Sequence, residues 1–299
     1  MTVLVTGGTG FVGRFIVERL ARAGRAVTVM GRTPPPAGFF THPVGFVAGS
    51  LDPAADHTSA LQGIDHLVHA AFDHRPGRYR GGEGDDPVAF RRRNRDGSIA
   101  LFDAARRAGV TRAVFLSSRA VYGLQKPGAI LHETTEPLPD TLYGGVKLSA
   151  ERALHALSDA RFTGVSLRVT GVYGPAAPGR AHKWTGLFSD YLAGRPVAPR
   201  VAAEVHGDDV AAAVQLALDC QDPPEDGLLN VSDLVLDRRG LLAIVRDATG
   251  CPHPLPDAAD ASTLNVMATD RLRALGWRPG GHALLERTVR ALLGAEPAG

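Results

Sequence analysis

The sequence predicts an α/β fold with a Rossmann-type doubly wound parallel sheet and a smaller C-terminal substrate lobe. Two observations support this: short apolar runs alternate with helical patterns through the first half of the 299-residue chain, and a glycine-rich turn follows the first run. Repeated strand–helix–strand spacing implies parallel strands with helices on both faces. We assign residues 1–170 to the Rossmann domain and 171–299 mainly to the lobe, with returning Rossmann elements around 205–232.

Each element follows from its local pattern. Glycines 24 and 109 are expected to close two of the helices, because glycine readily adopts the left-handed conformation found there. The charged, glycine-rich residues 73–87 and the proline-rich stretches 174–201 and 222–263 are expected to be irregular. The expected strands are 2–5, 26–30, 46–47, 66–70, 113–116 and 165–169, and the expected helices are 11–23, a short one ending near 63, 88–108 and 143–157.

Composition narrows the class of protein. A net charge of +2 gives no reason to expect nucleic acid or an anionic membrane as a partner. Cys220 and Cys251 have neither metal-type spacing nor the pattern of a disulfide framework, so no metal is expected and a reducing, cytoplasmic setting is the default. The sequence has no apolar run of about 20 residues, so no membrane span is expected.

The stretch TGGTGFVG after the first strand matches a dinucleotide-binding turn. An early glycine permits the tight turn, Gly10 allows a pyrophosphate close to the backbone, and Gly13 allows the helix to pack on the strand. The following helix would present free N–H groups to the phosphates. The second strand ends at Gly31-Arg32, without the acidic residue that usually binds an NAD ribose, and a guanidinium suits a 2′-phosphate. We therefore expect NADP in preference to NAD.

Tyr143 and Lys147 are four residues apart and therefore share one helix face. A tyrosine with a pKa of ~10 is a poor base at neutral pH, and a neighbouring ammonium favours the phenolate. Lysine is rare in this chain, at positions 126, 147 and 183 only, and arginine is the usual basic residue. Ser117 and Ser118 end the fifth strand, at the sheet edge where ligands bind. These residues predict an acid–base centre in which a serine holds a substrate hydroxyl or carbonyl beside the tyrosine.

The ordered motifs TGGTGFVG, Asn94-x-x-Gly97, SSRAVYG, YGGVK and RVTGVYGP resemble those of the extended short-chain dehydrogenase/reductase family, also called the NAD-dependent epimerase/dehydratase family. The resemblance covers residues 1–215 and, more loosely, 265–292. It implies a catalytic set of Ser118, Tyr143, Lys147 and the supporting Asn94. It also implies cofactor contacts from Gly7, Gly10, Phe11, Val12, Gly13, Arg32, Leu51, Ala70, Ala71, Ser117, Tyr143, Lys147 and Val172.

The sequence departs from the family's pattern at several positions. Sugar 4,6-dehydratases typically carry Asp and Glu where this chain has Arg119 and Ala120, so that elimination would lack its acid and base. The stretch after Gly194, where nucleotide-sugar enzymes grip the diphosphate, looks shortened. The expected substrate-binding residues are Ser118, Gly171, Arg180 and Lys183, whereas His69, His206 and the pair Asp208-Asp209 are expected to be structural.

The resulting functional hypothesis is an NAD(P)-dependent oxidoreductase acting on a secondary alcohol or ketone of a sugar, sugar acid or similar small molecule. The alternative is a nucleotide-sugar 4-epimerase with tightly bound NAD. A non-catalytic cofactor sensor is a third reading, but such proteins usually lose the tyrosine or the lysine. The resemblance also implies a homodimer through the helices that contain Asn94 and Tyr143. The apolar residues expected to be exposed on the second of these helices are Ala150, Ala153, Leu154 and Leu157.

Overall fold

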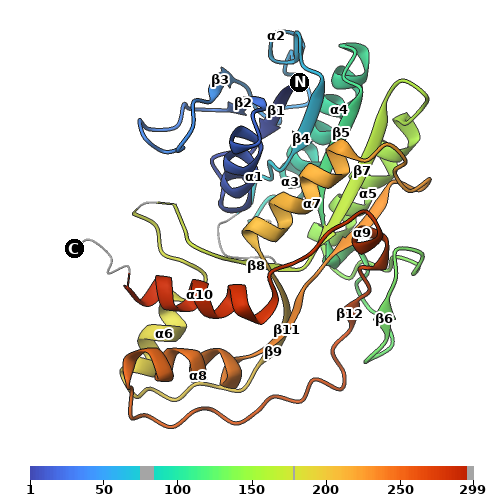
Figure 1. Cartoon of the computed structure of the whole chain (residues 1–299). Coiled ribbons are helices and arrows are strands. Elements are labelled where there is room, and N and C mark those ends of the chain that lie inside the picture. Colours follow the sequence, from blue (N-terminus) through green and yellow to red (C-terminus); the bar gives the residue numbers. More distant parts are fainter. Residues whose placement is uncertain (75–83, 178, 295–299) are drawn as a thin grey trace.

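Seven parallel strands form the central sheet of the molecule, which a computed structural model describes over residues 1–74, 84–177 and 179–294. Their order is β3-β2-β1-β4-β5-β7-β10 (Figure 1). Their bounds are β1 Thr2–Thr6, β2 Ala26–Gly31, β3 Gly45–Ala48, β4 His66–His69, β5 Arg112–Ser118, β7 Thr163–Val169 and β10 Leu228–Val231. The strand order reverses between β1 and β4, so the ligand crevice of such a sheet is expected outside the carboxyl ends of these strands. The predicted Rossmann-type fold is confirmed.

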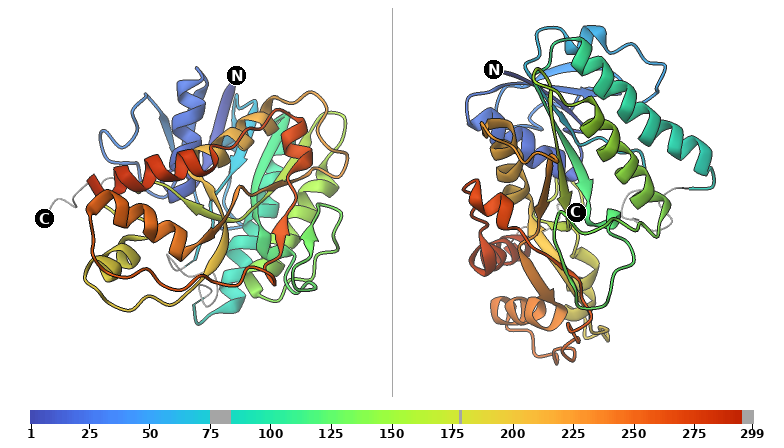
Figure 2. Two further views of the ribbon diagram at one scale, coloured as in Figure 1. Left: turned by 60° about the horizontal axis from the view of Figure 1, so that its bottom comes forward. Right: turned by 90° about the vertical axis from the view of Figure 1, so that its right-hand side faces the viewer.

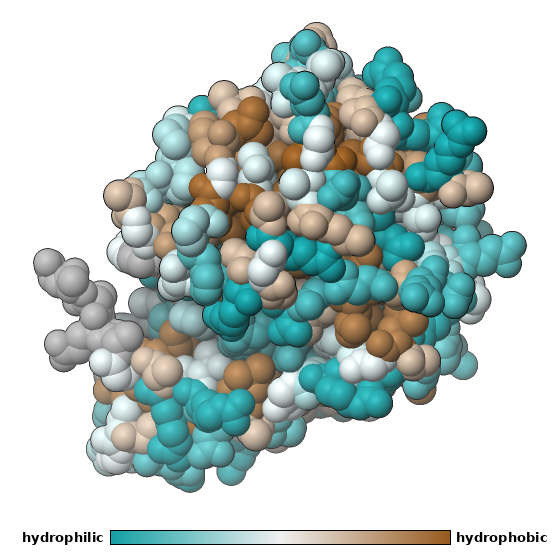
Figure 3. Space-filling view, turned by 45° about the horizontal axis from the view of Figure 1, so that its top comes forward, coloured by the Kyte–Doolittle hydropathy of each residue, from teal (hydrophilic) through white to brown (hydrophobic). Residues whose placement is uncertain are grey.

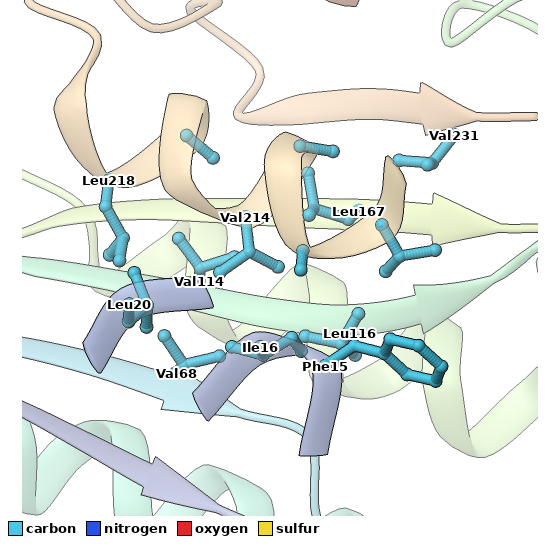
Figure 4. Packing of buried hydrophobic residues seen from close by; sticks show 14 of the residues in the cluster. Phe15, Ile16, Leu20, Val68, Val114, Leu116, Leu167, Val214, Leu218 and Val231 are labelled. Atoms are coloured by element: carbon cyan, nitrogen blue, oxygen red, sulfur yellow. The ribbon is translucent and has the colours of Figure 1, made fainter. Parts of the chain in front are cut away.

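Helices cover both faces of this sheet (Figure 2). Helices α1 (Phe11–Arg22) and α7 (Gly207–Asp219) pack on one face, where their apolar side chains meet those of β4, β5 and β7 (Figure 4). Helices α2 (Thr58–Leu61), α4 (Gly97–Arg107) and α5 (Leu142–Leu157) contribute to a second core on the other face. Burial on both faces explains why the strands are continuous apolar runs.

The second core corrects one detail of the predicted dimer surface. Ala150 and Leu154 are 0% and 1% exposed, because α5 turns these residues onto the sheet and α4. Leu157 packs against the margin of this core, and Ala153 is partly exposed. The prediction of an exposed apolar stripe was therefore wrong for Ala150 and Leu154. The homodimer itself stays a prediction.

The helix predicted over 88–108 is interrupted. It consists of α3 (Pro87–Arg91), a π-helical turn (Arg92–Asp96) and α4. A Cβ at Gly97, the first residue of α4, would overlap the backbone carbonyl of Leu51, so glycine lets the helix pack directly on the loop after β3. Single π-helical turns often occur at functional sites, and this one carries Asn94.

The chain after β7 builds the lobe in the lower half of Figure 1. Strands β8 (Gly171–Tyr173), β9 (Val201–His206) and β11 (Leu234–Asp237) form a three-stranded sheet. Helices α6 (Thr185–Leu192), α8 (Arg238–Thr249) and α10 (Gly281–Gly294) pack around it. Strand β12 (Val266–Met267) pairs with β6 (Ile130–Leu131), and α9 (Asp270–Ala274) follows. Between lobe segments, α7 and β10 return to the main sheet.

The surface mixes polar and apolar residues. Figure 3 shows hydrophobic residues interspersed with hydrophilic ones on the face that it presents. Within the described ranges, no helix is long and apolar enough to cross a membrane.

Candidate active site

The glycine-rich turn between β1 and α1 has the shape of a phosphate cradle. Gly7 has a φ of +70°, and the Gly10 amide donates to the Gly7 carbonyl at 2.9 Å. A Cβ at Gly13 would overlap that same carbonyl, so α1 can approach β1 only with glycine at this position. Gly10 caps α1 without a side-chain hydrogen bond, and the first turn contains no acidic residue. The first-turn amides can therefore receive an anion, and this turn fits the pyrophosphate of a dinucleotide.

The close contact between Gly13 and the Gly7 carbonyl predicts that any larger residue at position 13 disturbs the phosphate cradle. We expect Gly13→Ala to lower stability by about 1–3 kcal/mol, because the new methyl group displaces the Gly7 carbonyl. The same displacement should weaken NAD(P) binding markedly. The matched control is Gly240→Ala on α8, where an added Cβ meets no atom within 4 Å. Thermal unfolding and calorimetric titration with cofactor measure both effects, and unchanged cofactor affinity in Gly13→Ala would contradict the proposed role of the turn.

The end of β4 lies directly beside this turn. A Cβ on Gly7 would lie 2.6 Å from the amide nitrogen of Ala71, so the backbones of the two strand ends touch. His69 is fully buried and is held between Thr6 Oγ1 at 2.6 Å and Ser98 Oγ at 2.8 Å. Burial, assisted by the nearby Lys147 charge, lowers the His69 pKa to about 3. His69 therefore stays neutral and couples β1, β4 and α4, as a structural residue would.

Ser118 and Tyr143 are brought together by a short turn after β5. Ser118 caps the 3₁₀ turn Arg119–Val121 by accepting from the Ala120 amide at 3.2 Å. A Cβ at Gly144, the residue after Tyr143, would overlap the carbonyl of Ala120. Helix α5 thus begins in backbone contact with the turn that carries Ser118, and Thr141 caps the helix by accepting from the Gly144 amide at 3.0 Å. This packing places the serine and the tyrosine at the same edge of the sheet.

Lys147 lies one helical turn after Tyr143, and 4% of the residue is exposed. Its ammonium donates to the Leu116 carbonyl at 2.6 Å and lies 4.3 Å from the Phe72 ring centre and 4.6 Å from that of Phe115. It lies 5.9 Å from the centre of the Tyr143 ring. Burial lowers the Lys147 pKa to about 7, although the carboxylate of Glu151 opposes the shift. The Lys147 ammonium, with its lowered pKa, therefore lies near the Tyr143 ring.

Asn94 holds the loop that supports this centre. Its amide group accepts from the Asp73 N–H at 2.7 Å and donates to the Asp73 carbonyl at 2.9 Å. It also donates to the Phe90 carbonyl at 3.0 Å and is 1% exposed. Phe72, which precedes Asp73, packs edge-on against Tyr143 with ring centres 5.0 Å apart. Asn94 thus fixes the loop whose Phe72 packs against the tyrosine, and its supporting role in catalysis stays a prediction.

The sequence reasoning missed a buried ionic network behind the lysine. The Ser117 hydroxyl donates to Glu151, and Arg168 on β7 binds the same carboxylate at 2.8 and 3.2 Å. Both ionic side chains are 3% exposed. Ser117 was expected to contact the cofactor, but its hydroxyl is engaged in this network, which fixes the end of β5 to α5. The signal was available, since Glu151 follows Lys147 by four residues on the same helix face.

The predicted substrate residues Gly171 and Lys183 both lie beside the carboxylate of Glu204. The Lys183 ammonium forms an ion pair with Glu204, and a Cβ at Gly171 would lie 2.6 Å from that carboxylate and 2.9 Å from the ammonium. Val169 pairs in register with Ser118, so Gly171 lies close to the reaction centre. Arg180 is exposed on the loop after β8, and its contact with the substrate stays a prediction.

The remaining cofactor residues lie along the carboxyl edge of the sheet. Arg32 is exposed immediately after β2, Leu51 follows β3, and Val172 lies on β8. Phe11 and Val12 form the first turn of α1 beside Gly10. Their positions suit the cofactor contacts that the sequence predicts, which remain predictions.

His206 and Asp209 lie at the start of α7, where they form hydrogen bonds to the backbone. Asp209 accepts from the Gly280 amide at 3.1 Å, and burial raises its pKa to about 6. His206 caps α7 by accepting from the Asp208 amide at 3.1 Å. In the part of the chain that the structure describes, no group of three or more His, Cys, Asp or Glu side chains has a geometry suited to a metal ion.

Comparison with known proteins agrees with this geometry. Residues 3–232 match the model of the NAD dependent epimerase/dehydratase family, and the chain belongs to that family. It is 27% identical to a UDP-glucose 4-epimerase of Corynebacterium glutamicum, covering 93% of this chain and 91% of the relative. It is 28% identical to a dTDP-6-deoxy-L-talose 4-dehydrogenase (NAD(P)(+)) of Kitasatospora kifunensis, covering 98% and 95%.

A solved structure supports the same conclusion. The chain superposes on MoeE5 in complex with UDP-glucuronic acid and NAD with a TM-score of 0.79 and 26% identity, covering 98% of this chain and 99% of that one. The family resemblance inferred from the motifs is thereby confirmed. The fold and the family define an NAD-dependent enzyme of the extended short-chain dehydrogenase/reductase type.

Proposed function

We propose that this protein transfers hydride between NADP(H) and a secondary alcohol or ketone of a sugar, sugar acid or similar small molecule. The observation that carries the proposal is the buried Lys147, one helical turn from Tyr143 and beside the turn of Ser118. Among the described residues, a backbone carbonyl, two aromatic ring faces and a more distant carboxylate compensate the buried ammonium. Burying a cation without a close anion costs free energy, and the proposed assistance to the Tyr143 phenolate gives a functional reason for that cost.

Each protein group has one task in alcohol oxidation. The Ser118 hydroxyl hydrogen-bonds the substrate oxygen, and the Tyr143 phenolate accepts the hydroxyl proton as the carbonyl forms. A bound nicotinamide supplies the acceptor for the hydride that leaves the same carbon. In reduction, the Tyr143 phenol returns the proton to the oxygen. The Lys147 ammonium favours the phenolate by Coulomb attraction in a poorly solvated site.

The lobe favours a compact substrate. Only residues 193–200 connect α6 to β9, in the stretch where the sequence departs from nucleotide-sugar enzymes. This short connection favours a small molecule over the diphosphate of a nucleotide sugar.

A 4-epimerase is the second candidate. Relatives that cover more than nine-tenths of this chain carry that name, and epimerisation uses the same first hydride step. An epimerase would retain its cofactor and regenerate it in every cycle. The two candidates are therefore separated by whether reduced cofactor is released.

The choice of NADP rests on Arg32 and has its own test. We expect calorimetric titration to show tighter binding of NADP than of NAD, because the guanidinium can form charge-assisted hydrogen bonds with the 2′-phosphate. Arg32→Ala should lose roughly tenfold or more in NADP affinity and little in NAD affinity. Arg22→Ala, an exposed arginine at the end of α1, is the control. A clear preference of the wild type for NAD would overturn this part of the proposal.

A further inference from the structure

Arg119 directly follows the expected catalytic serine in the chain, and its positive charge has no task in the proposed chemistry. It is the first residue of the 3₁₀ turn capped by Ser118, so its side chain leaves the backbone next to the catalytic hydroxyl. Helix α5 contacts the same turn through Gly144, the neighbour of Tyr143. Arg119 therefore belongs to the turn that follows Ser118 and contacts the start of α5, next to Tyr143.

The charge of Arg119 is poorly compensated. The side chain is half-buried, and its hydrogen bonds, from Nη2 at 3.1 Å and from Nε at 3.4 Å, both go to the carbonyl oxygen of Asn265. Burial lowers the Arg119 pKa, whereas the more distant Asp140 carboxylate raises it. Among the described residues, no carboxylate lies within 4.0 Å of the guanidinium. Of its five N–H donors, most remain available to a ligand.

Three other partly or fully buried cations, Lys183, Arg168 and Arg271, form ion pairs, whereas the buried Lys147 donates to the Leu116 carbonyl and is assigned to Tyr143. Lys183 forms its ion pair with Glu204, and Arg168 forms one with Glu151. Arg271, farther along the chain, binds Asp226 at 2.7 Å. A cation withdrawn from water without a paired anion is costly, and the cost is recovered when an anion binds. Among the described residues, Arg119 is therefore the basic side chain next to Ser118 that has neither an ion pair nor a task in the proposed chemistry.

We propose that Arg119 binds a carboxylate of the substrate, so that the substrate class is a sugar acid or a comparable polyhydroxy acid. The inference rests on the proposed function and narrows it. A planar guanidinium matches a carboxylate through paired hydrogen bonds, and this geometry would orient the secondary hydroxyl toward Ser118 and Tyr143. Neutral sugars would enter the same site without that anchor.

The test compares sugars that differ in the carboxylate alone. D-Glucuronate is paired with D-glucose, and D-galacturonate with D-galactose, each titrated into the cofactor-loaded protein. Binding is measured by calorimetry, and oxidation by the absorbance of reduced nicotinamide. The variants are Arg119→Met, which removes the charge, and Arg119→Lys, which keeps the charge but loses the planar guanidinium that donates two parallel hydrogen bonds. Arg161→Met is the control, since Arg161 is exposed just before β7 at the opposite edge of the sheet.

We expect the wild type and Arg161→Met to bind at least one uronate about 10- to 100-fold more tightly than its neutral partner, the range for a hydrogen bond to a charged group. Arg119→Met should lose that preference, and Arg119→Lys should keep part of it. A wild type without preference for either uronate overturns the inference. So does an Arg119→Met variant that weakens uronate and neutral sugar equally, because the side chain would then only anchor the Asn265 segment.

The same experiment separates this inference from the proposed function. If uronates bind through Arg119 and no reduced nicotinamide appears, the carboxylate site stands and the proposed oxidation fails. If a neutral sugar is oxidised as well as its uronate and Arg119→Met has no effect, the oxidoreductase stands and the carboxylate site fails.

Discussion

Tyr143→Phe is expected to lower kcat by between about 10² and 10⁴, the range for the loss of a positioned acid–base group. The ring should stay in place, because it packs edge-on against Phe72, and phenylalanine preserves that contact. Cofactor affinity should change little, since the phosphate cradle lies on a different element. The measurement is steady-state reduction of NAD(P) by an active sugar or sugar acid, together with calorimetric binding of the cofactor.

Tyr191→Phe is the matched control for this variant. The Tyr191 hydroxyl donates to the His253 carbonyl at 2.9 Å within the lobe, away from the glycine turn. Its loss should lower the melting temperature slightly, by the equivalent of about 1 kcal/mol, and leave kcat unchanged. A Tyr143→Phe protein with wild-type kcat would remove the tyrosine from the mechanism.

Lys147→Met is expected to lower kcat by at least about 10²-fold and to move the rise of kcat to higher pH. The reason is the loss of the ammonium that favours the Tyr143 phenolate. Lys126→Met, at the exposed loop lysine, is the control and should behave as the wild type. Equal pH profiles for Lys147→Met and the wild type would contradict the assigned role of the ammonium.

The buried lysine also predicts how stability varies with pH. Its pKa falls from 10.5 to about 7 on folding, so between these values the unfolded chain binds more protons than the cofactor-free native state. The contribution of Lys147 to the free energy of unfolding therefore increases from pH 7 to about pH 10. Chemical denaturation of the wild type and Lys147→Met across this window measures the difference. A constant difference would show that Lys147 keeps an ordinary pKa.

The sequence predicted the central sheet and the contacts along it because these depend on local chemistry. Gly7, Gly10 and Gly13 have a backbone reason for each position, and Tyr143 and Lys147 have a helical one. Burial on both faces produced apolar runs that marked the strands. The π-helical turn around Asn94 was not predicted, because it depends on how Gly97 packs against Leu51, which is distant in the sequence.

The other differences between the predicted and the observed site depend on contacts between residues that are distant in the sequence. Ser117 lies next to Ser118 in the sequence, but its hydroxyl turns inward to Glu151, and only the pairing of β5, β7 and α5 reveals that choice. Lys183 was expected to contact the substrate, and its ammonium is paired with Glu204 on β9, which is distant in the sequence. Arg119 was identified as a departure from a dehydratase pattern, and its poorly compensated charge became visible only with its neighbours in place.

The most direct test of hydride transfer at this site is to follow reduced nicotinamide during incubation with sugars and sugar acids, and then to separate free from protein-bound cofactor. We predict that at least one substrate yields free NADPH in excess of the enzyme and that Tyr143→Phe abolishes this release. Reduced cofactor that never exceeds one per protein and stays bound would favour the epimerase. No reduced nicotinamide, free or bound, with any substrate would contradict the hydride-transfer mechanism proposed for Ser118, Tyr143 and Lys147.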